Sequence, residues 1–166
     1  MRTSRSRTLS FSRLLYRRSQ TPSTPLCRCL ATPCHTQDSI CFHATTPDGS
    51  HPGGVFTGDT LFIAGSGRFF EGTPPEMHAA LSYLGTLPDQ TIVYNGHEYT
   101  DGNVRFALSV VPDSKPLKRL DELVKANKVT TGLTTIGDEK EWNLFMQVES
   151  EAVRSASLVA MSARTV

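Results

Sequence analysis

The chain has 166 residues, of which 38% are hydrophobic and 20% are charged, a composition typical of a globular domain with a core of its own. The net charge is only +1, which argues against nucleic acid or an anionic membrane surface as the main partner. No apolar run approaches the length that a transmembrane helix requires, so the sequence gives no indication of a membrane partner.

The N-terminal segment differs in charge from the rest of the chain. The first acidic residue is Asp38, whereas arginine, serine and threonine are frequent before it. Such an acid-free, Arg-rich composition is typical of an organellar transit peptide. We predict a mitochondrial or cytoplasmic location. A disordered basic tail and translated sequence upstream of the true start codon are the alternatives. We predict that residues 1–28 form a basic leader without packed structure.

The four cysteines lie close together in the sequence, at positions 27, 29, 34 and 41. Their spacing, C-x-C-x4-C-x6-C, matches none of the common structural zinc motifs. A disulfide framework would suit a secreted chain, and nothing else in the sequence indicates secretion. We therefore expect ordinary reduced cysteines.

Two predicted strands follow the leader. Residues 39–45 (SICFHAT) are rich in residues that favour strands, and residues 55–59 (VFTGD) are the next such segment. Residues 47–54 (PDGSHPGG) lie between them and have the composition of a turn. The two strands are expected to pair as a hairpin.

A helix with a clear start is predicted after the glycine-rich loop at residues 65–72. Thr73 is the expected N-cap, Pro74 occupies the first helical position, and Glu76 follows three residues after the cap. Three apolar residues recur at helical spacing and predict the buried face: Met77, Leu81 and Leu84.

The second half of the chain predicts one more strand and two more helices. Residues 91–95 (TIVYN) are expected to form a short buried strand, one helix to follow Thr100, and another to begin near Ser114. Residues 141–150 (EWNLFMQVES) are expected to be extended or irregular. The order of the elements, mixed strands and helices and then a helical tail, predicts an α/β (α+β) fold.

Three possible metal ligands lie beside predicted strands. Asp59 and His97 come where strands end, and His35 precedes one. Neighbouring strands bring their ends to one edge of a sheet, where imidazoles and a carboxylate would suit zinc, iron or manganese. A carboxylate can also bridge two ions that share a water. The simpler alternative is that Asp59 belongs to a turn and each histidine is a hydrogen-bonded polar residue.

Four segments together resemble glyoxalase II, the hydroxyacylglutathione hydrolase of the metallo-β-lactamase superfamily. They are CLATPCHT (29–36), VFTGDTLFIAGSGRFFEGTPPEM (55–77), VYNGHEYT (93–100) and NLFMQV (143–148). The resemblance implies the C-terminal half of a metallo-β-lactamase αββα sandwich over residues 29–110, then a small helical region over residues 111–166. It also implies hydrolysis of S-lactoylglutathione to lactate and glutathione, a step of methylglyoxal detoxification, with two zinc ions or with iron or manganese.

The resemblance also assigns roles to individual residues. His35 and His97 correspond to ligands of different ions, and Asp59 to the catalytic carboxylate that bridges them. The implied substrate contacts are Arg68, Phe69, Phe70, His97, Glu98 and Tyr99. The family commonly has Lys and Tyr in the loop, so Arg68 keeps the positive charge and can bind a carboxylate in fork geometry, while Phe70 keeps the ring without the hydroxyl. Core packing is the alternative for Phe69 and Phe70.

One motif of the family is missing from the sequence. The family's THxHxDH motif supplies two ligands to each metal, and the Arg-rich leader stands where it is expected. Two protein ligands per ion would bind zinc more weakly than a full set. Three hypotheses stay open: a glyoxalase II-type hydrolase of glutathione thioesters, a truncated non-catalytic remnant, and an interaction module whose exposed sheet docks onto a partner chain that covers the missing half of the sandwich.

Overall fold

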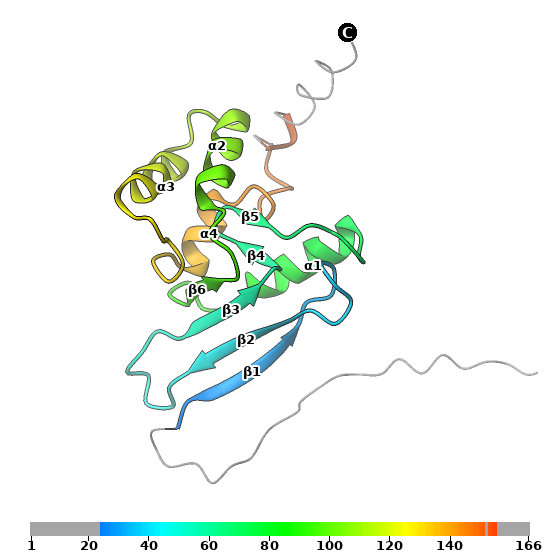
Figure 1. The fold of residues 1–166 in the computed structure, drawn as a ribbon, viewed down its shortest axis with the longest axis vertical. Helices are drawn as coiled ribbons and strands as arrows, with labels where there is room; N and C mark the ends of the chain where they lie inside the picture. Colours follow the sequence, from blue (N-terminus) through cyan, green and yellow to red (C-terminus); the bar gives the residue numbers. More distant parts are fainter. Residues whose placement is uncertain (1–23, 152, 156–166) are drawn as a thin grey trace, which may run out of the picture.

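The computed structural model describes residues 24–151 and 153–155, and its mixed strands and helices confirm the predicted α+β class (Figure 1). One sheet has the strand order β1-β2-β3-β6, with β1 antiparallel to β2, β2 antiparallel to β3, and β3 parallel to β6. Its strands are β1 (Leu26–Ala31), β2 (Ile40–Thr45), β3 (Gly54–Gly58) and β6 (Ile92–Asn95).

A small hairpin and the helices make up the remainder of the described chain. The hairpin consists of β4 (Leu61–Phe62) and β5 (Gly65–Ser66). The helices are α1 (Pro74–Leu84), α2 (Thr100–Val110), α3 (Lys115–Ala126) and α4 (Ile136–Trp142). In Figure 1 the hairpin lies between the four-stranded sheet and the pair formed by α2 and α3.

The predicted helix start at residue 73 is confirmed. Thr73 is the N-cap of α1, and the Glu76 carboxylate accepts hydrogen bonds from the Thr73 amide and hydroxyl, both at 2.8 Å. The predicted face of α1 is buried, and it packs against strand residues Leu30, Val55 and Val93 from one side of the sheet. The β2–β3 hairpin, β6, α2 and α3 also form where the sequence predicted elements.

Two sequence predictions are wrong at their boundaries. β1 begins at Leu26, so residues 26–28 belong to the sheet and not to a leader; six residue pairs with β2 stabilise this strand in spite of its Arg and Cys content. Residues 141 and 142 were expected to be extended or irregular but form the last turn of α4, which is stabilised by the Thr135–Asp138 capping box. The rest of the predicted leader, residues 1–23, lies outside the described residues.

Two further sequence predictions concern the state of the cysteines and the lack of a membrane-spanning helix. All four cysteines are free, as expected. Cys41 is buried, and this burial raises the pKa of its thiol, although hydrogen bonds from Thr32 and Thr60 act in the other direction. Among the described residues, we find no helix with the length and hydropathy needed for a bilayer crossing.

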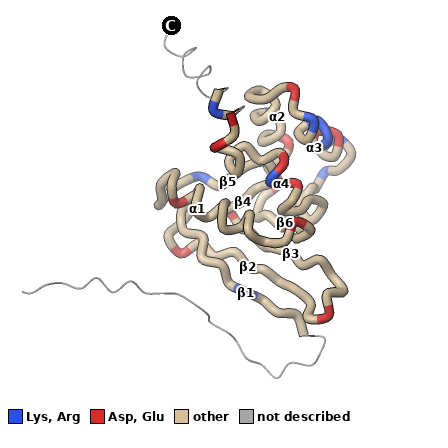
Figure 2. Tube along the Cα trace, turned by 180° about the vertical axis from the view of Figure 1, so that it is seen from behind, with Lys and Arg blue, Asp and Glu red and all other residues tan. Residues whose placement is uncertain are grey.

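The two sides of the four-stranded sheet differ in what covers them. α1 covers one side, whereas Phe42 and Phe56 on the other side are 45% and 50% exposed. The Phe56 ring stacks on Tyr94 of the next strand, with centroids 4.9 Å apart. Charged residues lie mostly over the helices and few lie along these strands (Figure 2). The second side is therefore an exposed apolar face.

Candidate metal centre and pocket

The parallel pairing of β3 and β6 explains why Asp59 and His97 lie close together. Each residue comes just after the carboxyl end of its strand, and parallel neighbours end at the same edge of a sheet. The Gly96 amide donates a hydrogen bond to the Gly58 carbonyl at 2.9 Å, which holds the two strand ends together. A Cβ atom at Gly96 would lie 2.8 Å from Asp59 Oδ1, so glycine permits this close approach.

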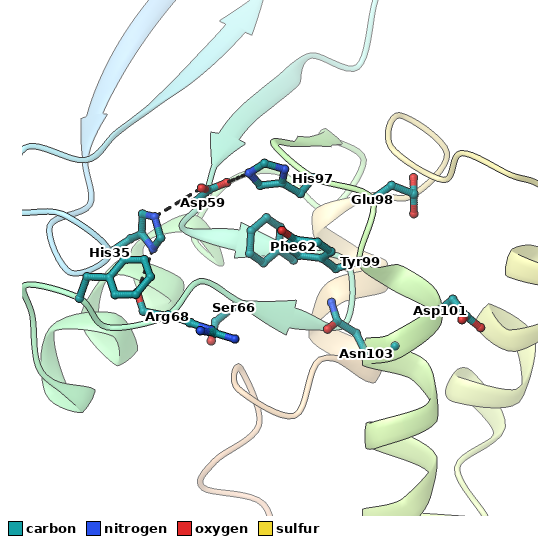
Figure 3. A pocket seen from close by; sticks show the side chains of 12 residues that line it. His35, Asp59, Phe62, Ser66, Arg68, His97, Glu98, Tyr99, Asp101 and Asn103 are labelled. Carbon is teal, nitrogen blue, oxygen red and sulfur yellow. Dashed lines mark hydrogen bonds and ion pairs between the residues drawn. The ribbon is translucent and has the colours of Figure 1, made fainter.

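His35 completes a group that we call the strand-end corner, formed by His35, Asp59 and His97. His35 lies in the loop between β1 and β2, and its Nε2 is 3.4 Å from Asp59 Oδ2. His97 Nε2 lies 3.3 Å from the other oxygen, Asp59 Oδ1. The carboxylate therefore stands between two imidazoles and presents one oxygen to each (Figure 3).

A backbone contact fixes the tautomer of His35. Its Nδ1 lies 2.9 Å from the Arg68 carbonyl oxygen, and a carbonyl only accepts, so Nδ1 carries the proton. In the neutral ring, Nε2 then directs a lone pair toward Asp59. Metal-binding histidines commonly have this arrangement, with the second ring nitrogen bound to a carbonyl or carboxylate.

The separations in the strand-end corner fit a metal-binding role. Both nitrogen–oxygen distances, 3.3 and 3.4 Å, exceed the usual N–H···O range of about 2.7–3.2 Å. Two ligand atoms that lie about 2.0–2.2 Å from one tetrahedral ion are about 3.3–3.6 Å apart. The donor types, imidazole nitrogen and carboxylate oxygen, also suit such ions.

The number of ligands is small. Within residues 24–151 and 153–155, no three His, Cys, Asp or Glu side chains are grouped so that they could hold one ion together. This agrees with the geometry of the corner, because each Asp59 oxygen faces a different imidazole. Each of two ions would therefore have two protein donors from this part of the chain.

The corner opens into a pocket of about 860 Å³. Its lining residues come from the strand ends, the β4–β5 hairpin, the loop after it and the start of α2: His35, Asp59, Phe62, Ser66, Arg68, Phe70, His97, Glu98, Tyr99, Asp101, Gly102 and Asn103. Aromatic rings surround the histidines. Phe70 lies 4.9 Å from the His35 ring, and Tyr99 stacks on His97 at 5.1 Å.

The structure brings most of the predicted substrate residues to this pocket, with one exception. Arg68, Phe70 and Tyr99 line it together with His97 and Glu98, whereas Phe69 does not. Core packing is wrong as an explanation for Phe69 and Phe70, because these side chains are 38% and 66% exposed.

Glu98 has a structural use that the sequence does not reveal. Its carboxylate accepts hydrogen bonds from the Thr130 amide and hydroxyl, both at 2.7 Å, and from the more distant Thr131 amide. Burial opposes ionisation of Glu98, but these hydrogen bonds and one from Thr100 outweigh it and lower the pKa of the carboxyl. Glu98 thus anchors the loop before α4 while it lines the pocket.

Sequence reasoning missed five residues of the pocket wall: Phe62, Ser66, Asp101, Gly102 and Asn103. Two of them lie inside a recognised segment, residues 55–77, and the others follow the recognised segment 93–100. Phe62 and Ser66 belong to the segment after Asp59, and Asp101 and Asn103 form the first turn of α2, just after GHEYT. Considering every residue of the segment 55–77, and continuing the segment 93–100 by three residues, could have found them.

Comparison with known structures first defines the class of the fold. The chain is similar to a metallo-β-lactamase from Staphylococcus aureus subsp. aureus COL, with a TM-score of 0.51 and 21% identity. This similarity covers 80% of our chain and 33% of the other. The described residues thus have a metallo-β-lactamase type of fold, as the motifs implied.

Sequence comparison then places the chain more closely. Residues 98–165 match the family described as Hydroxyacylglutathione hydrolase C-terminus. A probable hydroxyacylglutathione hydrolase of Schizosaccharomyces pombe is 52% identical over 120 residues, which is 72% of our chain and 45% of the relative. The cytoplasmic isozyme of Saccharomyces cerevisiae is 46% identical over 138 residues, or 78% and 50%. The chain is a homologue of the hydroxyacylglutathione hydrolases and spans about half their length.

Proposed function

We propose that the chain carries part of the active centre of a glyoxalase II-type thioester hydrolase that acts on S-lactoylglutathione and related S-2-hydroxyacylglutathiones. One observation carries the proposal: the Asp59 carboxylate stands between His35 and His97 at the end of a pocket. The names of the homologues support the same substrate class. The division into a partial metallo-β-lactamase-like domain over residues 29–110 and a helical region over residues 111–166 is part of this proposal.

The strand-end corner would hold two ions. His35 with one oxygen of Asp59 would bind the first, and His97 with the other oxygen would bind the second. Zinc, iron or manganese bound there would polarise a carbonyl oxygen and lower the pKa of a bound water. In this chain Asp59 is the shared ligand, so its loss would affect both positions at once.

The remaining residues would bind and orient the thioester. In the reaction, a water oxygen bonds to the acyl carbon, the carbon–sulfur bond breaks, and the sulfur leaves as a thiolate that takes up a proton. The Arg68 guanidinium can form a fork-shaped pair with a glutathione carboxylate, and the Tyr99 hydroxyl can donate a hydrogen bond. The Phe70 ring packs at a tilt against the His35 ring, with centroids 4.9 Å apart, and adds an apolar surface beside it.

A second candidate function is binding without turnover. Two donors per ion favour it, since the described residues supply fewer ligands than a hydrolytic zinc site normally has. The exposed apolar face that includes Phe42 and Phe56 favours it as well, because a partner chain that covers this face would bury apolar surface. In this version the chain is a remnant or an interaction module that retains half of a metal site.

For location, we retain the mitochondrial or cytoplasmic prediction. Relatives in Saccharomyces cerevisiae are named as cytoplasmic and mitochondrial isozymes, which is compatible with either place.

Metal content and turnover of the purified chain separate the two functions. The test measures bound zinc, iron and manganese, zinc affinity by chelator competition, and hydrolysis of S-lactoylglutathione. Under the proposal, Asp59→Asn lowers zinc affinity and turnover by at least about 100-fold, because the isosteric amide removes the charge that both ions share. The matched control is His78→Gln, a change at an exposed histidine of α1, which should leave both unchanged.

Two outcomes would count against the proposal. Turnover that survives Asp59→Asn would show that the reaction takes place elsewhere. A folded wild-type chain that binds metal but shows no turnover would favour the second candidate.

A further inference from the structure

The turn between β4 and β5 has an unusual number of side-chain contacts to its backbone. Asn143 Nδ2 donates to the Phe62 carbonyl at 3.3 Å and to the Gly65 carbonyl at 3.0 Å. The Ala64 amide donates to Glu139 Oε2 at 2.9 Å. Side chains of α4 and of its C-cap residue therefore bind backbone groups of three of the four residues in the turn at residues 62–65.

Two residues form what we call the clamp: Glu139 of α4 and Asn143, the C-cap residue that follows this helix. Both side chains are fully buried. Asn143 Nδ2 also donates to Glu139 Oε2 at 3.0 Å, and Trp142 Nε1 donates to Glu139 Oε1 at 2.9 Å. Burial of a carboxyl group is costly unless hydrogen bonds compensate for the loss of water, so the hydrogen bonds of Glu139 are needed to keep this side chain buried.

The turn itself has a strained backbone. Ala64 has φ +54°, and among the described non-glycine residues no other φ is positive. A side chain in this left-handed region costs about 1–2 kcal/mol, and such strain persists only where the surroundings fix the conformation. The clamp supplies this fixation, because Glu139 binds the amide of the strained residue itself.

The β4–β5 hairpin also forms part of the pocket wall. Phe62 and Ser66 line the pocket, and Arg68 follows two residues later. The Phe62 ring packs edge-on against Tyr99 at 5.2 Å and lies 6.1 Å from the His97 ring. A shift of the turn would therefore move the wall against which the substrate is placed.

We propose that Glu139 and Asn143 are positioning residues that hold the turn at residues 62–65 and thereby set the shape of the glutathione-binding pocket. The clamp acts through the hairpin backbone and touches no metal ligand, so it should affect ligand binding and leave the strand-end corner intact. The choice of a glutathione conjugate as ligand rests on the proposed function.

The test compares Glu139→Gln with a variant of similar instability. The comparison is made at pH 8.5, above the value of about 7 to which burial raises the pKa of Glu139, so that the wild-type carboxylate only accepts hydrogen bonds. Glutamine has the same shape, but its amide group places a donor opposite the donors of Ala64 and Asn143 or opposite that of Trp142. The matched control is Thr135→Ala, which removes the N-cap of the same helix without touching the hairpin. Asn143→Ala is the second clamp variant, used if Glu139→Gln does not fold.

Three measurements on the full chain follow for each variant. These are the affinity for S-methylglutathione, a thioether that cannot be hydrolysed as a thioester, the zinc affinity, and amide hydrogen exchange of Ala64 relative to Leu81 in α1. For Glu139→Gln we expect at least fivefold weaker S-methylglutathione binding, at least tenfold faster relative exchange at Ala64, and zinc affinity within twofold of wild type. Thr135→Ala should change none of these more than twofold.

The proposal is overturned if Glu139→Gln binds S-methylglutathione as wild type does, or if Thr135→Ala weakens binding equally. If the wild-type chain does not bind S-methylglutathione, the proposed function fails, and the exchange ratio alone then decides on the clamp. An unchanged ratio at Ala64 would overturn the clamp as well.

Discussion

The strand-end corner and the hairpin turn form two sides of one pocket, but they are held in place in opposite ways. Side chains of the corner are 20–51% exposed, and glycines beside them let backbone segments come close enough for Asp59 to meet both histidines. The turn is fixed by the fully buried side chains of Glu139 and Asn143. Precise placement thus comes from close backbone approach on one side and from buried hydrogen bonds on the other.

The largest expected effect tests the corner's dependence on glycine. A Cβ atom built on Gly67 would overlap the Asp59 carbonyl oxygen and would lie 3.3 Å from His35 Nδ1. Because a backbone oxygen cannot move aside cheaply, Gly67→Ala should lower the free energy of unfolding by about 2–4 kcal/mol and weaken zinc binding. Urea unfolding and chelator competition measure both effects. A variant as stable as wild type would show that the corner does not depend on this close approach.

The next prediction concerns the buried carboxyl group of Glu139, which holds the hairpin turn. Burial raises the pKa of Glu139 to about 7, although hydrogen bonds from Trp142, Asn143 and Ala64 act in the other direction and Asp138 adds to the rise. Between about pH 4.5 and pH 7 the folded chain therefore keeps a proton on Glu139 that the unfolded chain has lost. The contribution of Glu139 to the free energy of unfolding therefore falls as the pH rises from about 4.5 to about 7, by at most about 3 kcal/mol.

Comparison of two variants isolates this titration from that of other groups. Urea unfolding at pH 5 and pH 7.5 should show a smaller loss of stability for Glu139→Gln than for wild type, because glutamine does not titrate. Asp113→Asn, at a fully exposed carboxylate, should retain the wild-type loss. Equal losses in wild type and Glu139→Gln would mean that Glu139 is ionised throughout this pH range.

The smallest effect is a gain in stability. Gly102 lies inside α2, and a Cβ atom there would meet no other heavy atom within 4 Å. Gly102→Ala should therefore stabilise the chain by about 0.4–1 kcal/mol, because alanine favours the helix and restricts the unfolded chain. The gain is measurable as a higher urea midpoint. A loss similar to that of Gly67→Ala would contradict the distinction between tight and open glycine positions.

The comparison also explains which parts the sequence could predict. The start of α1 was predictable because Thr73, Pro74 and Glu76 act locally. The meeting of Asp59 and His97 followed from their places at strand ends, which parallel pairing brings to one edge. Their role as metal ligands stays a prediction.

The clamp could not be predicted in this way. Glu139 lies in the segment DEKEW, whose charges look like those of an exposed helix face, and its partner Ala64 is 75 residues away. The short helix that carries Glu139 was also missed, although the Thr135–Asp138 spacing is a capping signal. Glu98 is similar, since its bonds to Thr130 depend on tertiary folding.

Residue 68 affects the site in two separate ways, through its backbone and through its side chain. The peptide carbonyl of Arg68 orients the imidazole, while its guanidinium is exposed at the pocket. Any amino acid has that carbonyl, so exchange of the side chain leaves the histidine's proton where it is. Substitution at position 68 can therefore change the charge at the pocket without removing the hydrogen bond that orients His35.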